Sequence, residues 1–188
     1  MNEAGGRSSG RRAEAVGAPP AGVSRFAAYF RVRHYEMDAL GHVNNAVYLH
    51  YLEQAAIDHS AALGYDIARL RALGGVFIAR RHEIDYLRPA SAGDILQVVT
   101  WAVELKGAQA VRDYAIYRYE PPANARGLPD DALLPPDFAP PGAPVVLART
   151  HWVWVDAQSG RPRRMPAEMI APFLAAKPVN PWPVTPDL

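Results

Sequence analysis

The pattern of hydrophobic and polar positions begins at Phe26 and predicts a strand followed by a long helix. Residues 25–35 alternate apolar and polar side chains in part, as a half-buried strand does, and a glycine-containing loop over 36–44 follows. Over 45–63, apolar side chains recur at steps of three and four residues, which is the spacing of a helix. The other faces of this stretch are also largely apolar, so we expect a helix that is buried on several sides.

The rest of the chain predicts a short helix and a sheet. Gly64 ends the long helix, and a short second helix is expected from a cap at Asp66 through Leu73. A final helical turn is expected near Pro166. Strands are predicted over 76–87, 95–105, 109–120 and 145–155. A single sheet curled round one buried helix satisfies both patterns, so the sequence predicts an α+β fold with about five antiparallel strands wrapped round one long central helix.

Three segments lack this periodicity and define the expected domain organisation. One domain is predicted over 25–175, between a disordered N-terminal tail at 1–24 and a C-terminal tail at 176–188. Residues 1–24 have no apolar core of the kind that a secretory signal needs, and their two acidic residues argue against an organellar transit peptide. Residues 121–144 contain eight prolines, which cannot donate to a sheet ladder, and are expected to form an insertion between two strands. This insertion is either flexible decoration or a lid over a binding site.

Composition and charge exclude several classes of protein. With 188 residues, 49% of them hydrophobic, the chain can bury one sizeable core. A formal net charge of +1 without a concentrated cationic face argues against nucleic acid as a partner. The absence of cysteine excludes disulfides, cysteine-based zinc sites and thiol nucleophiles. No stretch approaches the roughly 18 apolar residues of a membrane helix, so no membrane partner is predicted and the cytoplasm is the expected compartment.

Two motif-like patterns lack the context that their chemistry requires. Residues 6–10 match the G-x-S-x-G pattern of serine hydrolases, but they lie in a low-complexity tail instead of a strand-to-helix turn. His34, Glu36 and Asp38 alternate and could ligate a divalent cation, yet their spacing matches no closed zinc site. We therefore predict neither a metal nor a cofactor.

The candidate chemistry lies in residues 35–48, which read YEMDALGHVNNAVY. An acid, a glycine-containing loop and a helix N-terminus follow one another in this stretch. The first N–H groups of a helix lack internal partners and carry partial positive charge, so they can hold a developing oxyanion. Asp38, just before them, could attack a carbonyl carbon or activate a water molecule. The alternative is that Asp38, Asn44 or Asn45 only caps the helix, and spacing alone favours this capping role.

These residues resemble the signature of the 4-hydroxybenzoyl-CoA thioesterase family, and the His-Val-Asn-Asn at 42–45 is also similar to plant-type acyl-carrier-protein thioesterases. Residues 76–89, followed by Gly93-Asp94, resemble the second strand and turn of the family. Residues 155–166 resemble its closing strand and terminal helix, so that the three blocks together cover 26–174. The resemblance implies the hotdog fold, in which five antiparallel strands wrap round a central helix.

The resemblance also implies roles for single residues. Asp38 falls on the catalytic aspartate of the family, and Asn45 falls at the helix start whose backbone N–H polarises the thioester carbonyl. His42 stands where many bacterial members have glycine or an aliphatic residue. It either acts as a base or substrate hydrogen-bonding group, or is a solvated loop histidine. Arg88 and Lys106 are candidate ligands of the CoA phosphates, although exposed basic residues are usually only solvated.

The function that these resemblances imply is hydrolysis of an acyl-CoA to a free acid and CoA. A thioester of acyl-carrier protein is an alternative substrate, because both substrates share the pantetheine arm. A non-catalytic acyl-thioester-binding protein is a second alternative, against which Asp38 argues. Family members dimerise edge to edge, often further to tetramers, with active sites at the subunit interface, so a homodimer or homotetramer is expected. Two features depart from the family pattern: Glu36 stands where aspartate is common, and typical members lack the insertion at 121–144.

Overall fold

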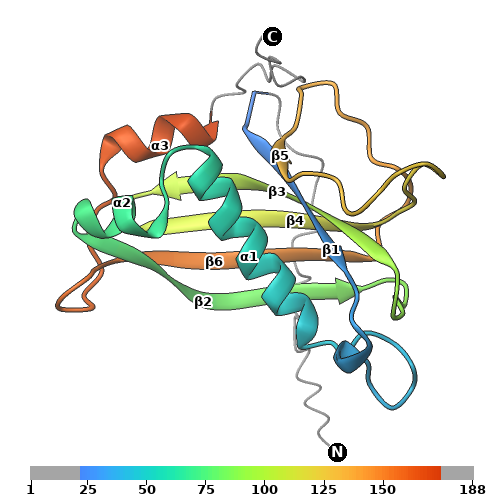
Figure 1. Ribbon diagram of the computed structural model, residues 1–188. Coiled ribbons are helices and arrows are strands. Elements are labelled where there is room, and N and C mark those ends of the chain that lie inside the picture. Colours follow the sequence, from blue (N-terminus) through green and yellow to red (C-terminus); the bar gives the residue numbers. More distant parts are fainter. Residues whose placement is uncertain (1–21, 175–188) are drawn as a thin grey trace, which may run out of the picture.

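The computed structural model describes residues 22–174 and shows one antiparallel sheet with a long helix across one face (Figure 1). The strands are β1 (Arg25–Arg31), β2 (Gly75–Tyr86), β3 (Ile95–Lys106), β4 (Gln109–Tyr119), β5 (Ala132–Leu133) and β6 (Val146–Asp156). The helices are a short 3-10 helix η1 (His34–Glu36), α1 (Val47–Ala62), α2 (Ile67–Ala72) and α3 (Ala167–Leu174). The strands lie in the order β2-β6-β4-β3-β1-β5, and every neighbouring pair is antiparallel. The predicted α+β hotdog arrangement is confirmed.

Most element boundaries agree with the sequence pattern, and β1 is an exception. Strands β2, β3, β4 and β6 lie within one residue of their predicted bounds, and the Asp66 side chain caps α2 as expected. β1 was expected over 25–35 but ends at Arg31. The Arg33 N–H donates to Glu36 Oε2 at 2.6 Å, and this bond turns the chain into η1.

The start of α1 also differs from the prediction. The helix begins at Val47 instead of residue 45. Asn44 accepts two hydrogen bonds, one from the Ala46 N–H to its side-chain Oδ1 and one from the Val47 N–H to its carbonyl, each at 2.9 Å. This side-chain-supported turn holds Asn45 just outside the helix. Asn44, and not Asn45, supplies the side-chain acceptor at this helix start.

The folded domain extends further toward the N-terminus than predicted. Ser24 is only 3% exposed, and its N–H donates to the Phe173 carbonyl at 3.0 Å. Residues 1–21 of the predicted N-terminal tail, with the pattern at 6–10, and the C-terminal tail at 176–188 lie outside the described residues. Within residues 22–174, no helix is long and apolar enough to cross a membrane.

A sixth strand comes from the proline-rich insertion at 121–144. β5 lies in a proline-free stretch of the insertion and pairs with β1 at one edge of the sheet. Leu134 and Phe138 pack on the face of the sheet that is turned away from α1, in a cluster around buried Trp101. The expected five strands are therefore six, because a segment between two prolines still offers free N–H groups to the edge of the sheet.

Helix α1 packs one face against the sheet. Its buried residues are Tyr48, Tyr51, Leu52, Ala55, Ala56 and His59. They join buried residues of β3, β4 and β6, such as Leu96, Tyr114 and Ala148, in the main core. The expectation that this helix is buried on several sides is wrong, because His50 and Glu53 on the opposite face are exposed.

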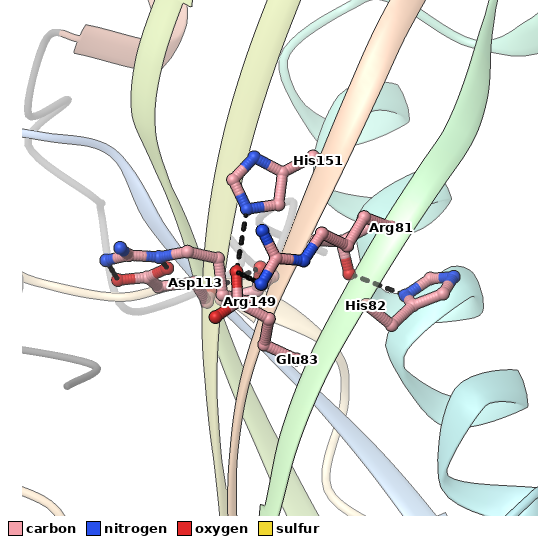
Figure 2. A network of polar contacts seen from close by, with 8 residues as sticks. Arg81, His82, Glu83, Asp113, Arg149 and His151 are labelled. Atoms are coloured by element: carbon pink, nitrogen blue, oxygen red, sulfur yellow. Dashed lines mark hydrogen bonds and ion pairs between the residues drawn. The ribbon is translucent and has the colours of Figure 1, made fainter. Parts of the chain in front are cut away.

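Polar contacts link β2, at the other edge of the sheet, to β6, and link β6 to β4 (Figure 2). Arg149 Nε and Nη2 donate to the two carboxylate oxygens of Asp113 at 2.6 and 2.8 Å, which ties β6 to β4. His151 Nε2 of β6 lies 3.0 Å from Glu83 Oε1 of β2, which Arg81 also approaches at 3.4 Å. These side chains fix the position of β2 relative to β6.

Candidate active site

The loop between η1 and α1 is closed by its own backbone. The Asp38 N–H donates to the His42 carbonyl at 2.7 Å, and the Gly41 N–H donates to the Asp38 carbonyl at 3.2 Å. Gly41 has a φ of 78°, a conformation that glycine adopts without strain. The Val43 N–H donates to the carbonyl of Ala90 at 2.8 Å. This last bond docks the loop on the chain that follows β2.

The carboxylate of Asp38 caps this loop and not the helix. Its Oδ1 accepts from the Leu40 N–H at 2.8 Å and from the His42 N–H at 3.1 Å. Its Oδ2 has no hydrogen-bond partner among residues 22–174. One carboxylate oxygen therefore orients the side chain, and the other is available to a substrate or a water molecule.

Glu36 connects the same loop to helix α1. Its Oε2 accepts from the Tyr51 hydroxyl at 2.7 Å as well as from the Arg33 N–H. Tyr51 lies on the buried face of α1, and its burial and the hydrogen bond to Glu36 raise the pKa of its phenol well above the usual value. Glu36 is thus a supporting residue, which links the position of Asp38 to the packed face of the helix.

Asn45 presents an unused backbone donor beside the first turn of α1. Its carbonyl accepts from the Tyr86 hydroxyl of β2 at 2.9 Å. Among the described residues, nothing accepts a hydrogen bond from its N–H or binds its side chain. An N–H group at the positive end of a helix is suited to an oxyanion.

A groove of about 510 Å³ lies between α1 and β2. On one side it is lined by Ala46, which precedes α1, and by Leu49, His50 and Glu53 of the helix. His82 and Trp152 close the opposite side. His82 Nδ1 lies 3.0 Å from Thr150 Oγ1, and partial burial lowers the pKa of His82 although the negative charge of Glu53 acts in the other direction (Figure 2).

A second cavity, of about 140 Å³, continues this groove along the helix. Glu53, Phe77 and Trp152 line both cavities. α1 contributes Ala56, Ile57 and Ser60 to the inner one. Together with the groove residues, these positions follow one face of the helix at steps of three and four. The two cavities thus form a channel along one face of α1, between the helix and sheet residues such as Phe77 and Trp152.

The channel lies away from the insertion at 121–144. No residue of that segment, all of which the structure describes, lines either cavity. The geometry therefore gives the lid interpretation no support.

The structure separates the two predicted phosphate ligands. Arg88 follows β2 at the end of the sheet where Tyr86 contacts Asn45, whereas Lys106 ends β3 at the opposite end. Both side chains are exposed. Within one chain they cannot bind the same phosphate group.

His42 is exposed and lines neither cavity. Its backbone alone makes the contacts described above, so its role stays a prediction.

Sequence reasoning did not single out His50, Glu53 or His82, which lie around the groove. His50 and Glu53 belong to the same helical stripe as Ala46 and Leu49, and this spacing was a usable signal. His82 could not be found in this way, because only the register between β2 and β6 brings it to the groove.

Residues 32–173 match the family model of the thioesterase-like superfamily. The chain belongs to this superfamily. A curated relative, the long-chain acyl-CoA thioesterase FadM of Escherichia coli, is 32% identical over 89 residues. The aligned region is 46% of this chain and 64% of FadM, so it spans less than two thirds of the length of that relative.

Two solved structures of thioesterases share the fold of this thioesterase-like chain. The DHNA-CoA thioesterase of Staphylococcus aureus has a TM-score of 0.60 at 16% identity, covering 74% of this chain and 80% of the other. The 1,4-dihydroxy-2-naphthoyl-CoA thioesterase of Synechocystis has a TM-score of 0.58 at 17% identity, covering 76% and 90%. At such identities the similarity extends to the fold alone.

The hydrogen bond between Tyr51 and Glu36 gives a first prediction. Tyr51→Phe removes the donor to the Glu36 carboxylate and should lower the free energy of unfolding by roughly 1.5–3 kcal/mol, the range for hydrogen bonds to charged groups. Urea denaturation measures this change. Tyr48→Phe is the matched control, because Tyr48 lies on the same helix, is 2% exposed, and makes no hydrogen bond through its hydroxyl within residues 22–174. Equal losses in both variants would show that the Glu36 contact contributes nothing of its own.

Proposed function

We propose that this protein hydrolyses acyl-CoA thioesters, with Asp38 as the catalytic carboxylate. One observation carries the proposal: the free Oδ2 of Asp38 and the unused N–H of Asn45 belong to the same loop, and the next residue after Asn45, Ala46, lines the groove. Membership of the thioesterase-like superfamily and the similarity to FadM support the same reaction. The closer relation to the 4-hydroxybenzoyl-CoA thioesterase family is part of this proposal.

In this mechanism the thioester carbonyl oxygen accepts a hydrogen bond from the Asn45 N–H. Negative charge that develops on that oxygen is stabilised by the positive end of α1. Asp38 either attacks the carbonyl carbon or takes a proton from a water molecule that attacks it. If Asp38 attacks, the C–S bond breaks as a mixed anhydride with Asp38 forms, and water then cleaves that anhydride; if water attacks, the C–S bond breaks directly. In both cases a proton from the water passes to the departing sulfur, CoA leaves as a thiol, and water supplies the oxygen of the free acid.

The substrate class follows from the walls of the channel. They are largely apolar over both cavities, which favours an extended aliphatic acyl chain over a compact aromatic one. A relative named as a long-chain acyl-CoA thioesterase supports this choice. Arg88 is a candidate for the CoA phosphates at the Asn45 end, and Lys106 remains a weaker candidate. A thioester of acyl-carrier protein stays the alternative substrate. A screen of acyl-CoAs of different chain length, with a thiol-trapping dye, tests the proposed class of acyl chain.

We further propose that the protein is a homodimer, or a tetramer built from dimers, in the cytoplasm. β2 is an edge strand, so one side of its backbone has no strand partner among residues 22–174. Ile78 and Tyr86 on β2 are 45% and 43% exposed, an apolar surface that pairing with a second copy would cover.

Asp38→Asn should keep the fold and lose most turnover. The amide oxygen can still accept from the Leu40 and His42 N–H groups, so the loop stays capped, but the amide is neither a base nor a nucleophile. General-base catalysis alone typically contributes 10²–10⁴-fold, so kcat on the best acyl-CoA should fall by about that factor. Turnover within threefold of the wild type, in a variant with an unchanged circular dichroism spectrum, would remove Asp38 from the mechanism.

Two substitutions at Asn45 distinguish the role of its backbone N–H from that of its side chain. Asn45→Ala keeps the N–H and removes a side chain without hydrogen bonds to the described residues, so kcat should change little. Asn45→Pro deletes the N–H, and loss of one oxyanion donor typically costs 10²–10³ in kcat. The Tyr86 bond to the Asn45 carbonyl remains available in both variants. The Asn45 N–H has no role in stabilising the oxyanion if the folded Asn45→Pro variant keeps the kcat of the wild type. The same conclusion follows if Asn45→Ala lowers kcat as much as Asn45→Pro does.

Light scattering tests the proposed dimer. At micromolar concentration the measured mass should be at least twice the chain mass of 20.6 kDa. Ile78→Lys places a charge on the apolar edge strand and should weaken association. Leu128→Lys is the control, because Leu128 is similarly exposed, at 39%, but lies in the insertion. A wild-type mass of a single chain contradicts the proposal, as does equal weakening by both substitutions.

A further inference from the structure

The inner cavity contains a buried charged group among largely apolar walls. Arg112 of β4 lines this cavity, and the residue is only 7% exposed. The other charged residue of the lining, Glu53, lies at the junction with the outer groove. Around Arg112 the walls are formed by side chains such as Ala110, Met169 and Phe173. A buried arginine is almost always paired with an acid, so the partner of Arg112 needs to be identified.

No residue that the structure describes supplies this acid. Among residues 22–174, no carboxylate oxygen lies within 4.0 Å of the Arg112 guanidinium. Its Nη1 donates to His59 Nδ1 at 2.8 Å and to Thr100 Oγ1 at 3.2 Å, and the Phe173 ring lies 5.7 Å away. Nε and Nη2 have no hydrogen-bond partner in the same range of residues. Two nitrogen atoms of the guanidinium are thus left for a ligand.

The acid next to Arg112 in sequence and the acid of the cavity lining are both held elsewhere by the fold. Asp113 follows Arg112 on β4, so its side chain points to the opposite face of the sheet, where it binds Arg149. Glu53 precedes His59 by six residues on α1, which corresponds to about 9 Å along the helix axis. Neither carboxylate can neutralise Arg112 in this structure.

His59 is a neutral partner of Arg112. A guanidinium can only donate, so His59 Nδ1 accepts, and His59 Nε2–H donates to Ser24 Oγ at 3.1 Å. Burial and the neighbouring Arg112 both lower the pKa of His59 well below its usual value, which keeps the ring uncharged. Burial also lowers the pKa of Arg112, yet a guanidinium stays protonated in proteins. The Arg112 guanidinium therefore places a full positive charge in the inner cavity, whereas Glu53 lies at the junction with the outer groove.

We propose that the inner cavity binds acyl chains that end in a carboxylate, with Arg112 as the counterion of that carboxylate. This inference rests on the proposed function and specifies its substrate class: mono-CoA thioesters of α,ω-dicarboxylic acids. The two free nitrogen atoms, Nε and Nη2, form the pair of donors that a carboxylate binds side by side. The buried charge would then be paired, as buried charges are in folded proteins.

The distance between the two ends of the channel sets the chain length. His59, the partner of Arg112, follows Asn45 by 14 residues, which corresponds to about 20 Å along the helix. C–C bonds of about 1.5 Å advance an extended chain by roughly 1.3 Å each, so about 16 carbon atoms span this distance. A chain of this length places its thioester at Asn45 and its terminal carboxylate at Arg112.

The test compares hexadecanoyl-CoA with the mono-CoA thioester of hexadecanedioic acid. For the wild type, kcat/KM should be roughly 10- to 100-fold higher for the diacid thioester, the factor expected of a charge-assisted hydrogen bond in a buried site. Arg112→Met should reverse this preference, and Arg112→Lys should retain part of it. Thr100→Val is the matched control, because it disturbs the same hydrogen-bonded cluster without removing the charge, and it should keep the preference.

Binding of non-hydrolysable thioether analogues of both substrates, measured by calorimetry, separates this inference from the proposed function. If neither thioester is hydrolysed but the diacid analogue binds at least tenfold more tightly, and Arg112→Met abolishes that difference, the inference holds and the proposed function fails. If both thioesters are hydrolysed with equal efficiency and both analogues bind equally, the inference is overturned and the proposed function stands. Thermal melts show which variants are folded, and the wild-type comparison decides the outcome even if Arg112→Met does not fold.

Discussion

A single helix on a single sheet can bury only one stripe of its surface in the core. The candidate site uses helix surface outside that stripe. Tyr48, Leu52 and Ala55 of α1 pack into the core against the sheet. A second stripe of the helix, from Ala46 to Ser60, lines the channel between α1 and the sheet and is apolar for most of its length. Apolar surface without a protein partner is stabilised by an apolar ligand. The same helix therefore serves as core on one side and as a wall of the proposed acyl channel on the other.

The register of β4 decides which charges belong to the scaffold and which face the channel. Arg112 and Asp113 are adjacent in sequence and lie on opposite faces of the sheet. Asp113 is paired with Arg149 and links β4 to β6, whereas Arg112 faces the cavity without an acid. A slip of one residue would exchange the two faces and bury a carboxylate beside His59. The long ladders of β4 with β3 and β6 prevent such a slip.

How far the sequence predicted the structure depends on the range of the interactions. The long helix and the four long strands follow from side-chain periodicity, whereas the proposed role of Asp38 comes from the resemblance to a family motif. The start of α1 was missed because the side chain of Asn44, and not the periodicity, fixes it. β5 was missed because its pairing with β1 joins residues about a hundred positions apart, which no local pattern reports. His82 and Arg112 reach the channel for the same reason, since only strand register sets the face on which each lies.

The two ends of α1 carry opposite partial charges, and the proposed substrate matches both. The N-terminal end carries about half a positive charge and lies beside Asn45, where an oxyanion would develop. The C-terminal end carries about half a negative charge, and His59, which binds Arg112, lies three residues before the last residue of the helix, Ala62. This partial charge offsets part of the guanidinium charge and leaves the remainder without a partner in a low-dielectric cavity. An acyl chain that ends in a methyl group leaves this remaining charge uncompensated, whereas a terminal carboxylate compensates it. The helix dipole therefore favours the thioester of the proposed substrate at the N-terminal end of α1 and permits its carboxylate at the other end.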